Sequence, residues 1–154
     1  MPAILEFVDA DVVQPLRTRV LRPLFSPGEH LVFPEDGRPT TLHVAASINA
    51  DVVGVATFLP NMTPYLDDRH AVQLRGMAVS PQMQGAGIGK CILDFALPAL
   101  KQRFERADWV WCNARETAVG FYDRCGFEIV SERFDIPNVG PHFVMRRLLV
   151  ENGK

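Results

Sequence analysis

The stretch VSPQMQGAGIGKCILDF, residues 79–95, decides the fold of this chain. It leaves an apolar run at a proline, passes three glycines at alternate positions (Gly85, Gly87 and Gly89) and continues with apolar residues at helical spacing. A strand, a turn of small residues and a helix N-terminus are therefore expected in succession. Such a helix start presents backbone N–H groups and a partial positive charge, which suit a phosphate or pyrophosphate. Taken alone, the glycines equally suit a tight strand-to-helix turn.

Two familiar phosphate-binding motifs are excluded at this loop. A P-loop with its lysine at Lys90 requires a glycine at Gln84 and a hydroxyl at Cys91. A dinucleotide-binding fingerprint that starts at Gly85 requires a glycine at Lys90, and one that starts two residues later requires it at Ile92. Neither pattern is present.

Length and composition predict one globular domain over residues 1–154. The chain has 154 residues, of which 47% are hydrophobic and 22% charged, as in ordinary globular proteins. Its net charge of −2 argues against a nucleic-acid partner, because nucleic-acid binders usually carry a basic stripe. No apolar run is long enough for a membrane span or a signal peptide, so we expect a soluble cytoplasmic protein with no membrane partner.

Cysteine and histidine spacing gives no support for a metal site. The three cysteines, Cys91, Cys112 and Cys125, form no CxxC pair, and their odd number argues against a disulfide framework. The four histidines show no HxxxH-type spacing. We expect no metal, and we expect Cys91 and Cys112 to be buried as small hydrophobic residues.

The first half of the chain alternates between strand and helix patterns. A strand is predicted at 3–8 and a helix at 10–24, with Asp11 near its N-cap and Pro15 in its first turn. Residues 23–40 contain four prolines and form a predicted long loop. A hairpin is predicted around Asn49, Ala50 and Asp51, and a further strand at 70–80.

The second half starts with an amphipathic helix at 87–104, whose apolar face is predicted to contain Ile88, Cys91, Ile92, Phe95, Ala99 and Leu100. A strand at 108–114, a short helix ended by Gly126, and strands at 127–136 and 142–150 follow. This order predicts a mixed sheet with helices on its faces.

Two segments resemble the GNAT superfamily of N-acetyltransferases. QGAGIG, residues 84–89, resembles its Q/R-x-x-G-x-G/A loop for the coenzyme A pyrophosphate, and NARETAVGFYDRCGF, residues 113–127, is similar to its tyrosine-bearing segment. The resemblance extends over residues 72–133. It implies an α/β (α+β) fold with a mixed, mostly antiparallel sheet of about six or seven strands and helices on both faces.

The resemblance also implies a reaction, the transfer of an acetyl group from acetyl-coenzyme A to a primary amine by direct attack in a ternary complex. Backbone N–H groups of the loop would hold the pyrophosphate, the preceding strand would pair with the pantetheine arm, and an N–H near Val79 would polarise the thioester carbonyl. The implied cofactor-binding residues are Met77, Ala78, Val79, Gln84, Gly85, Ala86, Gly87, Ile88, Gly89, Lys90, Asn113, Ala118 and Phe121.

Tyr122 occupies the family's position for the general acid that protonates the coenzyme A thiolate. A phenol with pKa near 10 is a weaker acid than a thiol with pKa near 8.5, but only by about 2 kcal/mol. The structural alternative is that Tyr122 packs as an aromatic residue beside Phe121 and Phe127.

The general base is not assigned. Many family members place a glutamate on the strand before the loop, but here that strand reads QLRGMAV, with Arg75 and no carboxylate. Glu29, His30, His70 and His142 are candidates, and a weakly basic amine needs no protein base.

The acceptor is a small molecule, peptide or protein with an amine, and residues 23–40 and 61–69 are expected on its side. A homodimer is expected from the resemblance alone. The alternative function is a catalytically silent acyl-coenzyme A-binding or sensing module that engages a protein partner.

Overall fold

The computed structural model of the protein describes residues 2–149. Residues 1 and 150–154, which the predicted domain and the last predicted strand include, lie outside the described residues. The first of two compact units comprises the chain up to Leu59 together with Leu74–Ala96, and the second comprises Pro60–Gln73 together with the chain from Leu97 onward. That these units act as one acetyltransferase domain stays a prediction.

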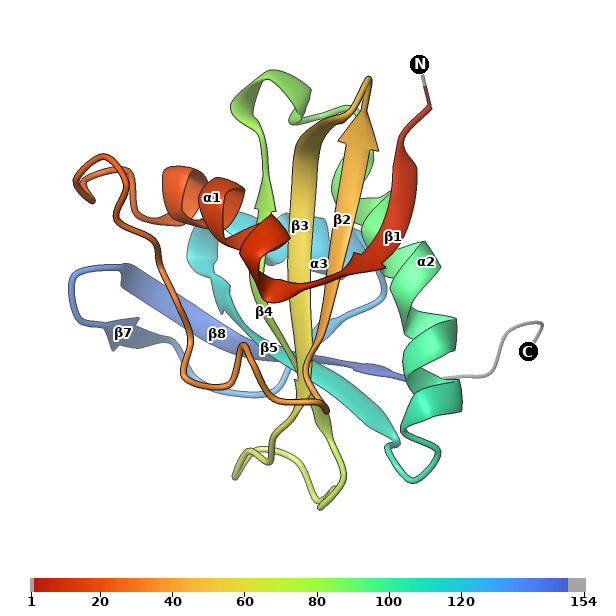
Figure 1. Ribbon diagram of the computed structural model, residues 1–154. Helices are drawn as coiled ribbons and strands as arrows, with labels where there is room; N and C mark the ends of the chain where they lie inside the picture. The colour runs from red at the N-terminus through yellow and green to blue at the C-terminus, as the bar shows by residue number, and fades with distance from the viewer. Residues whose placement is uncertain (1, 150–154) are drawn as a thin grey trace. The chain divides into compact units, whose positions relative to one another are not determined.

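The elements follow the predicted order (Figure 1), and the bounds are β1 (Ile4–Val8), α1 (Ala10–Leu21), β2 (Leu42–Ile48), β3 (Asp51–Pro60), β4 (Val72–Val79), α2 (Ile88–Arg103), β5 (Trp109–Arg115), α3 (Val119–Arg124), β6 (Glu128–Ile129), β7 (Phe134–Ile136) and β8 (Gly140–Leu148). Short 3-10 turns lie at Pro81–Met83 and Glu116–Ala118. The predicted mixed, mostly antiparallel α/β fold is confirmed. The described residues form eight strands rather than six or seven, because the predicted strand at 127–136 is two short strands.

In the first unit the strands are hydrogen-bonded in the order β1, β2, β3, β4. The predicted hairpin is confirmed, since β2 and β3 are antiparallel and Ile48 pairs with Asp51 across a two-residue turn. Asn49 and Ala50 form that turn with φ of 52° and 69°. Both central residues of a type I′ turn need positive φ, which asparagine tolerates better than alanine.

Helices α1 and α2 cover opposite faces of this sheet (Figure 1), as predicted. Val55 of β3 lies in a buried cluster with Val13 and Leu16 of α1. The preceding residue, Gly54, faces the other way, and a Cβ there would lie 2.6 Å from Ile88 of α2. Because successive strand residues point to opposite faces, the absence of a side chain at Gly54 lets α2 approach the sheet closely.

Helix α1 begins at Ala10 as predicted but ends earlier than predicted. Its N-cap is Asp9, and Asp11 lies near the cap in the first turn, as predicted. Pro15 lies inside the helix rather than in its first turn. The helix ends at Leu21, short of residue 24, because a proline at position 23 disfavours helical backbone at Arg22.

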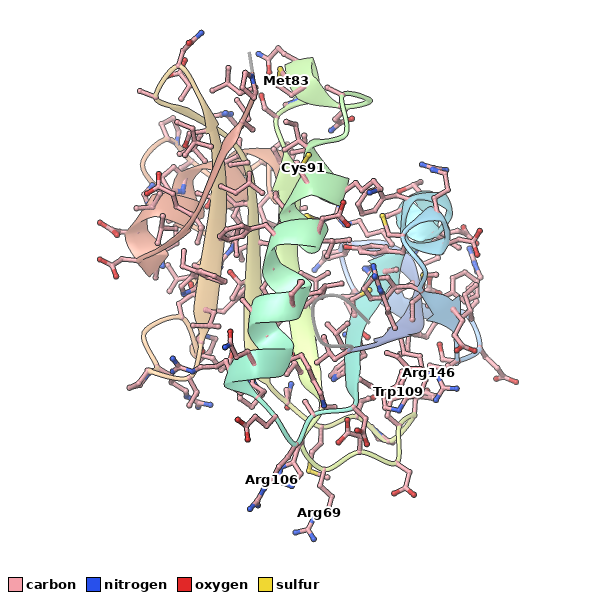
Figure 2. The ribbon with its side chains drawn as sticks, turned by 90° about the vertical axis from the view of Figure 1, so that its right-hand side faces the viewer. Arg69, Met83, Cys91, Arg106, Trp109 and Arg146 are labelled. Carbon is pink, nitrogen blue, oxygen red and sulfur yellow. The ribbon has the colours of Figure 1, made fainter. Side chains whose placement is uncertain are left out.

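Helix α2 buries the predicted stripe in part. Cys91 is exposed on its surface (Figure 2). Ile88, Ile92 and Leu100 are buried as predicted, and Phe95 and Ala99 are half-buried. Leu93, Ala96 and Leu97 are buried in addition. The prediction that Cys91 is buried is therefore wrong.

In the second unit the order is β4, β5, β8, β6, with β7 also paired to β8. Val72 and Gln73 pair in parallel with β5, and β5 and β8 are antiparallel from Trp109 opposite Leu148 onward. Arg146 of β8 lies over the ring of Trp109, with its Cζ 3.9 Å from the ring centroid (Figure 2). Among residues 2–149, no helix is long and apolar enough to cross a membrane.

Candidate functional site

The glycine loop joins the end of β4 to the start of α2 and presents an open surface. Gly85 and Gly87 have φ of 85° and 83°, and a Cβ at either position would meet no heavy atom within 4 Å. The positive φ explains why glycine is needed, since other residues are strained there. The open space shows in addition that no described residue other than the chain neighbours lies within 4 Å of a Cβ position at either glycine.

The start of α2 supplies the hydrogen-bond donors that an anion requires. At the start of the helix, the N–H of Cys91 donates to the carbonyl of Gly87, 3.0 Å away. Ile88 and Gly89 precede that bond, so their N–H groups have no carbonyl one turn earlier in the helix. The helix has 16 residues, and its aligned peptide dipoles add a partial positive charge at this end.

Two of the predicted loop residues are held by side-chain bonds. Gln84 Nε2 donates to the carbonyl of Val79 over 3.3 Å, so its side chain closes the loop onto the end of β4. Lys90 Nζ lies 2.6 Å from Asp94 Oδ2 on the exposed surface of α2. These contacts leave the backbone of the loop as its main binding surface.

The predicted pantetheine-binding residues lie at the end of β4. Ala78 is buried in the cluster beneath α1, while Met77 and Val79 are half-buried. The N–H of Ser80 donates to the carbonyl of Val53 over 2.8 Å and fixes the end of the strand. Gly76, two residues before Ala78, has φ of 61° and interrupts the regular strand backbone.

The remaining predicted cofactor residues lie in the second unit. Asn113 is exposed in the middle of β5, between the buried Cys112 and Ala114. Ala118 and Phe121 are half-buried around the start of α3. Asn113 therefore faces away from the core of this unit, as a ligand-binding side chain must.

Tyr122 is a packed aromatic residue. Its side chain is buried, and its ring contacts Phe121 and Phe127 edge-on, with centroids 5.1 Å and 5.2 Å away. Burial raises the pKa of Tyr122 well above 10, with smaller contributions from Cys112 and Cys125. The phenol is therefore protonated at neutral pH, as a general acid must be, but its proton is harder to remove than that of an exposed tyrosine.

The cysteines and the candidate general bases differ in how deeply they are buried. Burial raises the pKa of the Cys112 thiol, so it stays protonated. His142 is buried against Phe134, and its Nδ1 lies 2.7 Å from the carbonyl of Gly140. Glu29 accepts the N–H of Ser26 at the exposed surface. Within residues 2–149, no three His, Cys, Asp or Glu side chains are arranged to hold a metal ion.

A buried charged network was missed by the sequence analysis. Arg17 of α1 is fully buried and forms an ion pair with Asp36 of the long loop, with Nη1 2.7 Å from Oδ2. The spacing of the helix could have indicated that Arg17 is buried, because it follows Val13 by four residues and so lies on the same, buried face. Beside it, Arg75 of β4 pairs with Glu35, with 3.0 Å between Nη1 and Oε1.

Comparisons with known proteins agree with this geometry. Residues 39–129 match the family model described as an acetyltransferase (GNAT) domain. The uncharacterized N-acetyltransferase YitI of Bacillus subtilis (strain 168) is 33% identical over 134 residues, which cover 87% of this chain and 88% of the relative.

Solved structures show the same fold. Escherichia coli ElaA is similar with a TM-score of 0.75 and 18% identity, over 94% of this chain and 99% of that one. An aminoglycoside 6'-N-acetyltransferase complexed with coenzyme A gives a TM-score of 0.70 at 14% identity, over 98% and 99% of the two chains.

Proposed function

The chain belongs to the GNAT family of acetyltransferases and is thus an acyltransferase, and from this premise we propose that it transfers the acetyl group of acetyl-coenzyme A to a primary amine in a ternary complex. The observation that carries the proposal is the open glycine loop at the start of α2. Gly85 and Gly87 keep its inner side clear of side chains, and the helix start supplies donors of the kind that bind a pyrophosphate.

Acetyl-coenzyme A supplies the activated acetyl group as a thioester. The loop from Gln84 to Lys90 binds the pyrophosphate through its backbone, and Met77–Val79 orient the pantetheine arm through theirs. An N–H near Val79 stabilises the negative charge that develops on the carbonyl oxygen, and such fixed donors are often the largest catalytic contribution. Asn113, Ala118 and Phe121, in the second unit, remain proposed cofactor-binding residues.

Tyr122 is proposed to donate its hydroxyl proton to the sulfur that leaves. Its raised pKa keeps the proton in place until a thiolate is present. The same raised pKa makes the transfer less favourable than for an exposed phenol, so the proposal requires that bound substrate stabilise the phenolate. A silent acyl-coenzyme A sensor is not favoured by any feature of the described residues.

Thermal unfolding in the presence of acetyl-coenzyme A, coenzyme A, NAD or ATP tests the donor site. A ligand at about 100 times its dissociation constant adds about 2.7 kcal/mol of stability, which raises the midpoint by several degrees. We expect shifts with the two coenzyme A forms alone, and amine-dependent release of free thiol. A shift with NAD or ATP instead, or thiol release that needs no amine, contradicts the proposal.

A further inference from the structure

The long loop between α1 and β2 is held by a buried polar anchor. Arg17 donates from Nη1 and Nη2 to the two carboxylate oxygens of Asp36, and Nη2 also donates to Thr57 Oγ1 over 2.6 Å. The N–H of Phe33 donates to the same carboxylate over 3.1 Å. The segment around residues 33–36 is therefore fixed in place, although it has no helix or strand.

The anchor places an aromatic ring beneath a second arginine. The ring of Phe33 lies 4.1 Å from Arg17 Cζ and 4.0 Å from Arg75 Cζ. Gly76 makes room for this stack, since a Cβ there would lie 2.8 Å from Arg17 Nε and 3.2 Å from Phe33. Stacking of a guanidinium group on an aromatic ring restricts its rotation and pre-orients its N–H donors.

Arg75 and Glu35 form the part of this assembly that solvent reaches. Their side chains are 31% and 23% exposed. An ion pair that solvent still reaches contributes only modestly to folding stability, and that contribution does not require a guanidinium group held on a half-buried aromatic ring. The pair presents a cation and an anion side by side on a rigid base, which matches a ligand that carries both charges.

One buried N–H donor of Arg17 has no hydrogen-bond acceptor within residues 2–149. Arg17 Nε has no hydrogen-bond partner among the described residues, and it faces Gly76. Buried donors of this kind are usually satisfied. A Cβ at Gly76 would already lie 2.8 Å from this atom and 3.2 Å from Phe33, so Arg17 Nε stays enclosed within the anchor.

The position of Arg75 on β4 suits the binding of the amine substrate. Arg75 precedes Met77 by two residues on β4, with Gly76 between them. Met77 begins the segment proposed to orient the pantetheine arm. A ligand at Arg75 would therefore lie close to the reacting end of the donor.

We propose that Glu35 and Arg75 form the acceptor subsite, and that the acceptor is an amino acid whose carboxylate binds Arg75 and whose ammonium group binds Glu35. This assignment rests on the proposed acetyltransferase function and narrows its acceptor to a zwitterionic amine. Binding breaks the ion pair between Glu35 and Arg75 but forms two new ion pairs with the ligand. The free energy of binding is therefore little reduced by the broken pair.

Binding of the twenty common L-amino acids tests the assignment, first by thermal unfolding and then by calorimetric titration of the best ligand and its carboxamide. Both are measured with and without coenzyme A. We expect the carboxylate to bind at least about tenfold more tightly than the carboxamide, since a charged hydrogen bond is lost in the latter. Arg75→Gln should remove this preference and Arg75→Lys should retain part of it, while Glu35→Gln should weaken both ligands.

Glu128→Gln is the control, because Glu128 likewise forms an ion pair with an arginine that solvent reaches, Arg146. It should leave amino-acid binding unchanged. Equal binding of acid and amide, a preference that persists in Arg75→Gln, or no binding by any of the twenty amino acids overturns the inference. Stabilisation by acetyl-coenzyme A is measured in parallel and reports on the proposed function separately, because it does not depend on Glu35 or Arg75.

Discussion

Arg17 and Asp36 form an ion pair that is almost completely withdrawn from solvent, with side chains 0% and 4% exposed and 2.7 Å between Nη1 and Oδ2. The pair connects α1 to a loop that has no regular structure. Because the loop also carries Glu35 and Phe33, this one contact links the stability of the fold to the geometry of the proposed acceptor subsite.

Removing one partner of the pair should destabilise the protein strongly. In Arg17→Met the Asp36 carboxylate stays buried without its cation, and we expect a loss of about 3–5 kcal/mol in the free energy of unfolding, measured in urea. The double variant Arg17→Met/Asp36→Asn should recover part of this loss, because the amide is neutral. Arg133→Met, in the exposed pair with Glu116, is the control and should hardly move the midpoint.

Stability should fall at acid pH through Asp36. Burial by itself raises the pKa of this carboxyl, but hydrogen bonds from Arg17, Gln14 and Phe33 together with the charge of Arg17 outweigh it, and the pKa lies below its ordinary value of 3.8. The contribution is therefore complete above the unfolded pKa and is lost as the pH falls below 3.8 through the folded pKa. In Asp36→Asn, the free energy of unfolding should depend less on pH in the acid range. The same dependence in wild type and variant would show that other carboxylates cause the loss of stability at low pH.

Tyr122→Phe should lower kcat by about a hundredfold or more, as expected when a general acid is removed. Binding of acetyl-coenzyme A, followed by its thermal shift, should be unchanged, because the ring contacts with Phe121 and Phe127 remain. Since the pKa of Tyr122 is well above 10, kcat of the wild type should show no loss from Tyr122 ionisation below pH 10. A kcat unchanged in the variant leaves Tyr122 as a packing residue only.

Gly85→Ala should abolish most of the stabilisation by coenzyme A, because its methyl group would occupy the open side of the loop. Backbone strain at φ of 85° will also destabilise the fold itself. Gly28→Ala separates the two effects, since Gly28 has the same φ of 85° and equally open surroundings outside the loop. Gly28→Ala should be destabilised to a similar extent but should still be stabilised by coenzyme A. If coenzyme A stabilises neither variant, the assignment of the glycine loop as the pyrophosphate site is refuted.

Ala50→Gly should stabilise the protein by about 1 kcal/mol, or roughly 2–4 °C in the unfolding midpoint. Ala50 has φ of 69° in an exposed turn, where glycine is not strained. Ala45→Gly in the neighbouring β2, where the backbone is extended, is the opposite control and should destabilise. A lower midpoint in Ala50→Gly would show that the turn is not strained.

Much of the fold could be predicted because its signals are local. The hairpin followed from two apolar runs around Asn49, and the end of α3 followed from Gly126, which has φ of 88° as a helix C′ residue requires. The errors also have local causes. Helix α2 places Ile88 and Ile92 against Gly54 and leaves Cys91 exposed, a rotation that the spacing of apolar residues alone does not define.

By itself, the sequence determined the family, the order of elements and the glycine loop, since turn residues and periodicity act over a few positions of the chain. Only the tertiary structure decided that Arg17 is buried against Asp36, that Gly76 makes room for this arginine, and that Glu35 meets Arg75. The residues of each ion pair are separated by 19 and 40 positions, respectively. Their interaction depends on the path of a loop without periodic signals, so no local pattern predicts it.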